Sequence, residues 1–505
     1  MGIRFAFSLG LLFWPSCRGF SPPPAARASS SLHLFQGMKN IAQGITGGGT
    51  YDATLPSDAA PSWDVLQEKA NATPFGTQQG ILQAHWDEGA GPPHTDAKLR
   101  LFGRKAPEVT LYRDTAAWCP YCMKVVMMLE LKEIPYKVEK INMRSYGEKP
   151  AWYLKKVPSG LLPALEFRGQ LITESLVIMQ TLDGAFAGAR KMLPESSTPE
   201  WDFASRMMQQ ERNLFRWWCE FVFRPGDRAR QPFEETLLEV DAALSSTPGP
   251  WLSGRDHPDL VDLTYIPHLE RMCASTAYWK GYTIRGNPKF PAINRWFEAL
   301  EVLPSYQAFR GDFYSHITNI PPQYGPGFTI DGAEEFQSTI LGKDGSWDLP
   351  LPPLSESRTQ GGKGSLEPVL EVNEVSDETA RAEASVKLCK NHEAIVRFAA
   401  RAVGKPSGWG LGPGRAELAD PHAVPNETII PDMDVTLRVV VDALLSGERD
   451  SAWVPKGLSK DNAEALIQCC EYLRDRVGVP RDMSYLAARQ ARAHLNWAIQ
   501  TLKTT

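Results

Sequence analysis

The positions of apolar residues along the chain separate a region of short strands from regions of long helices. Between residues 106 and 190, four short runs have the length and the β-branched or aromatic content of strands. These runs are Val109–Tyr112, Tyr136–Ile141, Ala164–Phe167 and Gln170–Ile172. Apolar residues recur at helical spacing from Cys122 to Leu129, and another helix is predicted at Ser175–Leu182. The order βαβ followed by ββα predicts a small α/β domain.

A helical pattern follows this domain and continues over residues 195–320. One apolar stripe extends over residues 203–218 and another over residues 233–244. Asp259 and Asp262 stand three residues apart before an apolar run, an acid–acid arrangement that caps the start of a helix. We therefore expect an all-helical domain here and assign Asp262 a role in folding.

Two stretches lack sustained periodicity and are interpreted as linkers. Residues 41–105 are rich in Gly, Pro and Thr; one short helix is expected at Trp63–Ala70, and the rest is predicted to be mostly disordered. Residues 321–380 form the second linker, and between positions 341 and 365, 12 of 25 residues are Gly, Pro or Ser. Beyond it, residues 381–505 are predicted to form a small helical extension. Its helices are expected at 382–403, 434–445, 459–477 and 484–502.

The first 40 residues have the composition of a targeting leader. No Asp or Glu occurs from Met1 to Tyr51. Arg4 followed by the apolar run Phe5–Trp14 is typical of a secretory signal, and the basic, Ser-rich and Ala-rich stretch after Phe20 is typical of a plastid transit peptide. Together they resemble bipartite plastid-targeting leaders, so we predict a plastid location. The alternative is a disordered tail on a cytoplasmic protein.

Composition narrows the class of protein. The chain has 505 residues, of which 43% are hydrophobic and 22% charged, and its net charge of -5 disfavours binding of nucleic acid. The longest apolar run, Phe5–Trp14, is about half of what a membrane-spanning helix needs, so we expect no integral membrane protein. Eight cysteines are too few for a disulfide scaffold. Only Cys119 and Cys122 have a chemically suggestive spacing.

The Cys-Pro-Tyr-Cys motif falls where the first predicted strand meets the first helix, as in thioredoxin-like domains. A thiol at a helix N-terminus faces unsatisfied N–H groups and the positive end of the helix dipole, which stabilise its thiolate. Cys119 is the predicted exposed nucleophile, and Cys122 is either the resolving thiol or a buried core residue. Pro120 suits the first helical turn, and Tyr121 is free to line a pocket. Inert core cysteines and half of a zinc site are the structural alternatives; because no second Cys or His pair follows at ligand spacing, no metal is predicted.

Four motifs in order, within about 60 residues, carry a family resemblance. They are Trp118-Cys-Pro-Tyr-Cys122, Lys149-Pro-Ala-Trp152, Val157-Pro-Ser-Gly-Leu-Leu-Pro-Ala-Leu-Glu166 and Gly169-Gln-Leu-Ile-Thr-Glu-Ser175. In these motifs the chain resembles the N-terminal domain of cysteine-type glutathione transferases, nearest to the omega class, with kinship to glutaredoxins and dehydroascorbate reductases. The resemblance extends over about residues 107–320 and includes the all-α second domain of these enzymes, but not the helical extension.

The resemblance implies a glutathione site, to which Pro120 and Tyr121 also belong. The backbone of Leu162 would pair with the cysteinyl unit of glutathione, before a cis peptide bond to Pro163. Ser175, at a helix start, suits the γ-glutamyl carboxylate, Glu174 suits the ammonium, and Lys149 faces the glycyl end. Taken alone, Lys149 is a solvated surface charge, Pro163 a turn proline, and Glu174 with Ser175 a helix cap.

The function implied is that of a glutathione-dependent thiol transferase or oxidoreductase. The Cys119 thiolate would attack a mixed disulfide or an oxidised substrate such as dehydroascorbate, and glutathione, the co-substrate, would resolve the adduct. The second substrate is a small molecule or a protein thiol, and the family implies a homodimer. A prostaglandin-synthase-like isomerase explains Cys-Pro-Tyr-Cys but not Lys149-Pro-Ala-Trp152. A non-catalytic glutathione-binding scaffold, with C-terminal helices that recruit a partner, is the other alternative.

Three further groups of residues have both a structural and a functional interpretation. Trp217, Trp218 and Phe221 either line a second-substrate pocket or, as we favour, pack in the core. Cys469 and Cys470 are adjacent in the middle of a helix, where a buried structural role is expected. A basic stretch near the C-terminus either meets an unknown acidic protein partner or forms a solvated helix face, which we favour. Its members are Arg481, Arg489, Arg492 and His494.

Overall fold

The computed structural model describes most of the chain beyond the predicted leader. The described residues are 49–52, 54–143, 147–188, 190–354, 366–367, 375–407 and 420–504. The leader predicted at 1–40 lies outside them. Among the described helices, none combines the length and the hydropathy needed to cross a bilayer.

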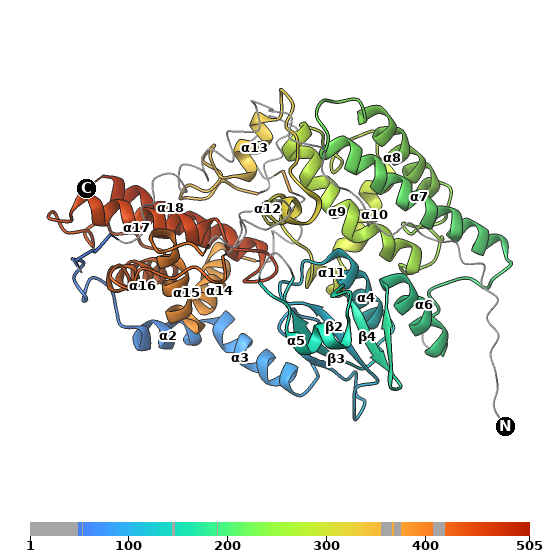
Figure 1. Ribbon diagram of the computed structural model, residues 1–505, viewed down its shortest axis with the longest axis horizontal. Helices are drawn as coiled ribbons and strands as arrows, with labels where there is room; N and C mark the ends of the chain where they lie inside the picture. Colours follow the sequence, from blue (N-terminus) through green and yellow to red (C-terminus); the bar gives the residue numbers. More distant parts are fainter. Residues whose placement is uncertain are drawn as a thin grey trace. The chain divides into compact units, whose positions relative to one another are not determined.

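A five-stranded mixed sheet forms the first domain. Its strand order is β1-β3-β2-β4-β5, in which β2 and β3 are parallel and the other neighbours are antiparallel (Figure 1). The strands are β1 (Leu99–Arg100), β2 (Val109–Asp114), β3 (Tyr136–Ile141), β4 (Ala164–Phe167) and β5 (Gln170–Thr173), and the helices are α4 (Pro120–Leu131), α5 (Ala151–Lys156) and α6 (Ser175–Ala185). The thioredoxin-like α/β fold predicted from the pattern is confirmed. The short strand β1, an addition to the edge beside β3, was not predicted.

Helices alone make up the second region, as predicted. They are α7 (Pro199–Val222), α8 (Arg230–Ser245), α9 (Leu260–Lys280), α10 (Pro291–Glu301), α11 (Pro304–Gln307) and α12 (Phe313–Tyr324). Every residue of α9 is buried, so this helix is the centre of the region. Its predicted capping box is present: the Asp259 N–H donates to Asp262 Oδ2 at 3.0 Å, and Trp296 Nε1 donates to Asp262 Oδ1 at 2.9 Å. Asp262 thus joins the start of α9 to α10.

The stretch interpreted as an N-terminal linker differs most from expectation. It contains α2 (Trp63–Ala72), where one short helix was expected, and also α3 (Pro74–Asp87). Leu66 and Ala70 are fully buried in a core shared with the C-terminal helices. Thr54 N donates to Asp432 Oδ1 at 3.0 Å. The prediction of disorder was wrong for these residues because their partners lie far along the chain, where local periodicity carries no signal.

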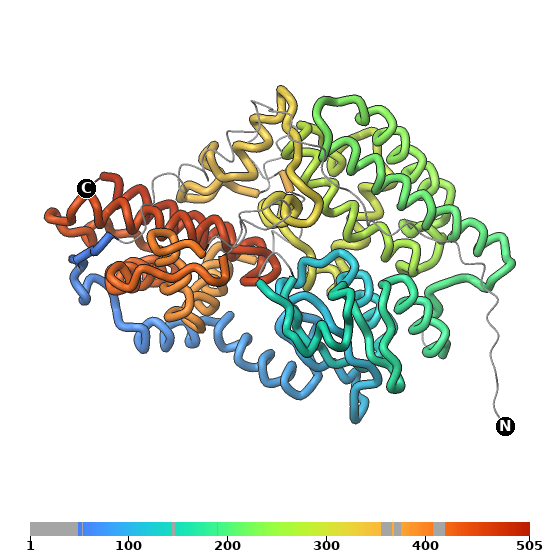
Figure 2. Tube along the Cα trace, viewed as in Figure 1, coloured from blue at the N-terminus to red at the C-terminus, as the bar shows by residue number. Residues whose placement is uncertain are grey.

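The extension is a helical bundle, as predicted. Its helices are α14 (Asp377–Lys390), α15 (His392–Ala399), the 3-10 helix η2 (Ala400–Val403), α16 (Ile430–Ser446), α17 (Lys460–Arg474) and α18 (Tyr485–Lys503). In Figure 2 the blue segment of α2 runs beside the orange and red extension, and α2 contacts both α14 and α16. The second predicted linker also holds a helix, α13 (Glu334–Ile340). Cys469 and Cys470 are fully buried in α17, which confirms their structural interpretation.

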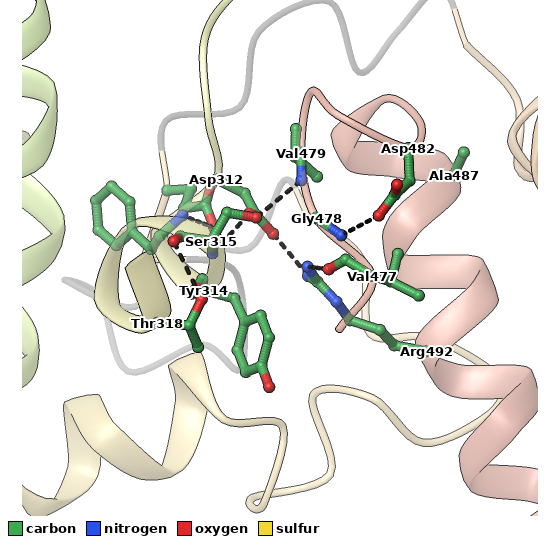
Figure 3. Close-up of polar contacts among 12 residues, drawn as sticks. Asp312, Tyr314, Ser315, Thr318, Val477, Gly478, Val479, Asp482, Ala487 and Arg492 are labelled. Carbon is green, nitrogen blue, oxygen red and sulfur yellow. Dashed lines mark hydrogen bonds and ion pairs between the residues drawn. The ribbon is translucent and has the colours of Figure 1, made fainter. Parts of the chain in front are cut away.

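The basic stretch near the C-terminus is not a solvated helix face. Arg492 is 1% exposed, and its guanidinium pairs with Asp312 Oδ2 at 2.6 Å and donates to the Val477 carbonyl at 2.7 Å (Figure 3). Val479 N donates to Ser315 Oγ at 2.8 Å. Arg489 and His494 are also buried, whereas Arg481 is half-buried beside Asp482. Arg492 does meet an acid, but that acid lies at the start of α12 in the same chain.

Candidate active site

The catalytic candidate Cys119 is held by a buried carboxylate. Cys119 is the residue before α4, and the loop that leads to it starts at Asp114, the last residue of β2. Asp114 is fully buried, and its Oδ2 accepts the Trp118 N–H at 2.6 Å and the Cys119 N–H at 3.1 Å. Asp114 Oδ1 has no hydrogen-bond partner in the described structure. Cys119 is 7% exposed, less than an exposed nucleophile was expected to be, because the loop packs inward.

Cys122 lies one turn into α4 and is 1% exposed. Burial, and then the neighbouring Cys119, raise the pKa of the Cys122 thiol well above its usual value. Cys122 therefore stays protonated until another group removes its proton. This fits both roles left open by the sequence, a resolving thiol or a core residue.

One group of possible metal ligands converges among the described residues. The ligand atoms of Asp114, Cys119 and Cys122 all lie within 4.8 Å of one another. A structural zinc site needs four protein ligands, and Asp114 Oδ2 already accepts two N–H groups. The trio therefore does not complete such a site, and its arrangement suits thiol chemistry.

A buried lysine near the cysteine pair was missed from the sequence. Lys124, on α4, is 5% exposed, and its Nζ lies 5.1 Å from the centre of the Tyr121 ring. Burial lowers the Lys124 pKa to about 8, while the negative charges of Glu211 and Cys119 act in the opposite direction. A positive charge on Lys124 thus attracts a Cys119 thiolate. The sequence signal was a single cation inside an otherwise apolar helical run.

Tyr121 borders a polar network contributed by α7 and α9. Its ring meets His268 edge-on at 5.5 Å, and His268 Nδ1 lies 2.6 Å from Glu211 Oε1. Burial lowers the His268 pKa to about 3, so the imidazole is neutral at physiological pH. Burial would raise the Glu211 pKa, but His268 and Arg212 lower it to about 2. The Tyr121 ring therefore contacts a neutral imidazole whose Nδ1 lies beside the Glu211 carboxylate.

Trp118 anchors the loop before α4 to the helical domain. Arg271 of α9 lies 4.4 Å from the centre of the Trp118 ring and donates to the Trp118 carbonyl. Trp118 Nε1 donates to His316 Nδ1 of α12 at 3.1 Å, and His316 Nε2 lies 2.6 Å from Glu270 Oε1. Because Nδ1 accepts, the Nε2–H donates to the carboxylate and the imidazole is neutral, as burial requires. Positions so far apart could not be joined from sequence spacing.

The residues expected to bind glutathione lie on several elements of the first domain. The Leu162–Pro163 peptide bond is cis, as the resemblance implied, and the Leu162 carbonyl lies 4.0 Å from Cys119 Sγ. Lys149, half-buried before α5, has its Nζ 6.0 Å from the Tyr153 ring centre. The structure thus brings the Leu162 carbonyl to the cysteine, and the Lys149 side chain lies beside Gly160 and Tyr153.

Glu174 and Ser175 form the start of α6, as expected. Glu174 is exposed, makes no side-chain capping hydrogen bond, and has a φ of +68°. Such a conformation costs a non-glycine residue roughly 1–3 kcal/mol and is concentrated at ligand sites. Ser175 is the first residue of the helix, where backbone N–H groups are available to an anion. Glu174 therefore occupies the N-cap position of α6 but does not cap the helix through its side chain.

The aromatic residues of α7 divide between the core and the surface. Trp218 and Phe221 are buried, and Trp218 Nε1 donates to Ser275 Oγ at 2.8 Å. Trp217 is half-buried, with Arg216 stacked on its ring at 4.5 Å. The favoured core interpretation holds for Trp218 and Phe221.

Comparison with known proteins agrees with this architecture. Residues 118–185 match the family model of the glutathione S-transferase N-terminal domain, and residues 226–299 match that of the C-terminal domain. Two segments of the chain therefore match the two domains of glutathione S-transferases, and the resemblance expected from its motifs is confirmed.

Individual relatives cover the same part of the chain. Glutathione S-transferase L3 of Arabidopsis thaliana is 27% identical over 203 residues, which are 39% of this chain and 81% of the relative. Glutathione S-transferase omega-1 of Sus scrofa is 38% identical over 90 residues, 18% of this chain and 36% of the relative. The structure of Chlamydomonas reinhardtii dehydroascorbate reductase aligns with 42% of this chain and 96% of its own, at 22% identity and a TM-score of 0.35. The two sequence relatives, both named glutathione S-transferases, support an enzyme of the glutathione transferase kind.

Proposed function

We propose that this protein is a glutathione-dependent thiol–disulfide oxidoreductase of the omega-like kind, with Cys119 as its nucleophile. The observation that carries the proposal is the position of Cys119: it stands at the start of α4, with its Sγ 4.0 Å from the carbonyl before cis-Pro163. A cysteine there favours exchange of disulfides, because the thiolate itself attacks sulfur. Lys124 adds a positive charge that attracts the thiolate.

The reaction proceeds in two exchanges. The Cys119 thiolate attacks the glutathionyl sulfur of a mixed disulfide, forms a disulfide with glutathione, and releases the substrate as a thiolate. A glutathione thiolate then attacks the same glutathionyl sulfur, which gives glutathione disulfide and restores the Cys119 thiolate. The proton lost by glutathione goes to the released substrate. With dehydroascorbate, two glutathione molecules are oxidised and ascorbate forms.

Glutathione is held by the residues that the resemblance implies. The Leu162 backbone takes its cysteinyl unit beside Cys119. The N–H groups at the start of α6, with Ser175, take the γ-glutamyl carboxylate, and the exposed Glu174 carboxylate takes the ammonium. Lys149 takes the glycyl end. Pro120 and Tyr121 border the thiol.

Cys122 is not required for this route. Its burial keeps it protonated, so glutathione rather than Cys122 resolves the adduct. A dithiol route would instead need a group that deprotonates Cys122.

A hydroxyethyl disulfide assay with glutathione tests the nucleophile. Cys119→Ser is expected to lose at least about 99% of the activity, because a serine hydroxyl does not form the mixed disulfide. Cys122→Ser should keep substantial activity, and Cys219→Ser, in α7, serves as the matched control. Activity retained in Cys119→Ser contradicts the proposal. Normal glutathione affinity without turnover of disulfide or dehydroascorbate would favour the non-catalytic scaffold.

We also propose that the protein is imported into a plastid. The support is the acid-free leader with its apolar run followed by a basic, Ser-rich stretch. Residues 1–40 fused to a fluorescent protein should direct it to the plastid of an algal cell. A cytosolic signal would overturn this proposal and favour the cytoplasmic alternative.

A further inference from the structure

A cavity outside the glutathione site lies between the sheet domain and the extension. It has a volume of about 810 Å³. Its walls come from the end of α3, from β1 and β3 at the sheet edge, from α14 and α15, and from the segment after α17. Figure 1 shows α3 running from the extension towards the sheet, and α3 contacts both α14 and β1. Segments about 300 residues apart therefore build one site.

The cavity is lined by an excess of positive charge. Seven cationic side chains face three carboxylates, Asp87, Asp96 and Asp482. The cations are Lys98, Lys140, Lys387, Lys390, Arg401, Arg476 and Arg481. The lining thus carries a net charge of about +4, whereas the whole chain carries -5. The fold thus brings together cationic residues that lie far apart in the sequence.

The carboxylates do not neutralise this charge. Asp96 forms ion pairs with two lysines: Lys387 Nζ lies 3.4 Å from its carboxylate, and Lys140 Nζ lies 3.6 Å from it. Arg481 pairs with Asp482 at 2.6 Å. The Arg401 guanidinium donates to a backbone carbonyl, that of Asp420, and its charge therefore remains.

Further support comes from the free lysines and from a neighbouring histidine. Lys98 and Lys390 are exposed and have no ion-pair partner among the described residues. Burial, and then the Lys387 ammonium, lower the pKa of the adjacent His94 to about 4. Burial is the larger cause, and the Lys387 ammonium adds to it, so a further cation is disfavoured beside Lys387.

One wall of the cavity is apolar. Trp86, Leu388, Ile395 and Phe398 contribute to it. The Trp86 ring is stacked on His94 at 4.1 Å, which fixes its orientation. An inorganic anion would fill only a small part of 810 Å³, a volume within the range of ligand pockets. Arginine forks match phosphate oxygens in geometry.

We propose that this cavity binds a phosphorylated organic anion of nucleotide size. Its phosphates lie among the lysines and arginines, and its apolar or planar part lies against the wall formed by Trp86, Ile395 and Phe398. The site goes beyond the proposed oxidoreductase activity and uses none of its residues.

Calorimetric titration of the full chain with three probes tests the ligand class. ATP is expected to bind, tripolyphosphate to bind more weakly, and adenosine to show no binding at the same concentrations. The dissociation constant for ATP should rise with salt, because charge dominates the contact. Absence of ATP binding overturns the proposal. Equal affinity for tripolyphosphate overturns the role of the apolar wall, and equal affinity for adenosine overturns the role of the cations.

A pair of double variants tests the location. Lys98→Gln with Lys390→Gln removes two lining charges and is expected to weaken ATP binding by about tenfold or more. The matched control, Lys456→Gln with Lys460→Gln, removes two exposed charges that do not line the cavity and should change the affinity less than about twofold. Equal weakening in both overturns the assignment. Thermal unfolding confirms that each variant is folded.

The two functions are separable in the same preparations. Cys119→Ser should still bind ATP, and the Lys98 and Lys390 variant should keep its disulfide reductase activity. Loss of reductase activity in Cys119→Ser with no ATP binding by the wild-type chain would refute only the cavity. ATP binding with full activity in Cys119→Ser would refute only the proposed oxidoreductase.

Discussion

Two cysteine pairs in this protein differ in their position on a helix, and we propose thiol chemistry for only one of them. Cys119 starts α4, next to Asp114 and near Lys124, whereas Cys469 and Cys470 lie within α17 among apolar side chains. Burial raises the pKa of Cys470 to about 12 and that of Cys469 well above its usual value. All these thiols are nearly inaccessible, so exposure alone does not distinguish them. The polar surroundings at the start of α4 distinguish Cys119 from the two thiols within α17.

Alkylation by iodoacetamide should show the largest difference between the pairs. In the folded protein we expect Cys119 to react at least about 1,000 times faster than Cys469 or Cys470, because the thiolate is the reactive form. A time course followed by peptide mass spectrometry measures each site. In urea the rates should become similar. Comparable rates in the folded protein would contradict the proposed difference in reactivity between Cys119 and the two cysteines of α17.

The contact between the extension and α12 should contribute strongly to stability. Arg492→Leu leaves Asp312 as a buried charge without its partner, which is expected to lower the free energy of unfolding by about 3–5 kcal/mol. Denaturant unfolding measures the change. As a control, Arg481→Leu removes a half-exposed pair and should cost no more than about 1 kcal/mol. Similar losses in the two variants would mean that burial of the first pair has no special effect.

Removal of the Asp114 carboxylate should disturb Cys119 while leaving Cys469 and Cys470 unaffected. Asp114→Ala leaves the N–H groups of Trp118 and Cys119 without their acceptor. We expect a loss of disulfide reductase activity of roughly tenfold to hundredfold, because the Cys119 thiolate moves from its position. Asp442→Ala, which removes a surface ion pair of α16, is the control and should retain activity. Full activity in Asp114→Ala would show that the carboxylate does not position Cys119.

Loss of the Lys124 charge should have the smallest effect. Lys124→Met is expected to slow alkylation of Cys119 about fivefold at pH 7, because the ammonium attracts the thiolate. The Lys124 pKa is lowered to about 8, so the ammonium loses its proton as the pH rises through 8. The ratio of wild-type to variant rates should therefore fall towards one above that pH. A ratio that does not change with pH would assign the effect to packing.

The folded state should also respond to Lys124. Its pKa is lower in the folded protein than in the unfolded chain, so between about pH 8 and 10.5 the unfolded chain binds more protons. This residue alone therefore makes folding more favourable as the pH rises across that window. The unfolding free energy of the wild type minus that of Lys124→Met should therefore rise over the same pH range.

Local patterns in the sequence determined most elements of this protein. The four predicted strands, the start of α6 and the last three predicted helices of the extension agree with the structure, because alternation, helical periodicity and caps act between near neighbours. The helix predicted at 382–403 was wrong in its extent, because the chain breaks at Asn391 and forms α14, α15 and η2 instead. The Cys-Pro-Tyr-Cys motif could be placed at a strand-to-helix junction for the same reason. The position of Cys119 before a helix, on which the proposed thiol chemistry rests, could therefore be predicted from the sequence.

Tertiary structure decided what depends on residues far apart. Leu66 looked like part of a linker and Arg492 like a solvated charge, yet each is buried by partners contributed from distant segments. Lys124 is buried near Cys119, and His316 reaches Trp118 across about 200 residues. The basic cavity likewise collects its cations from several helices and the sheet edge. The burial of a side chain and the charge around it depend on every residue that is close in space. A local window of sequence includes only some of these residues, so it does not determine either quantity.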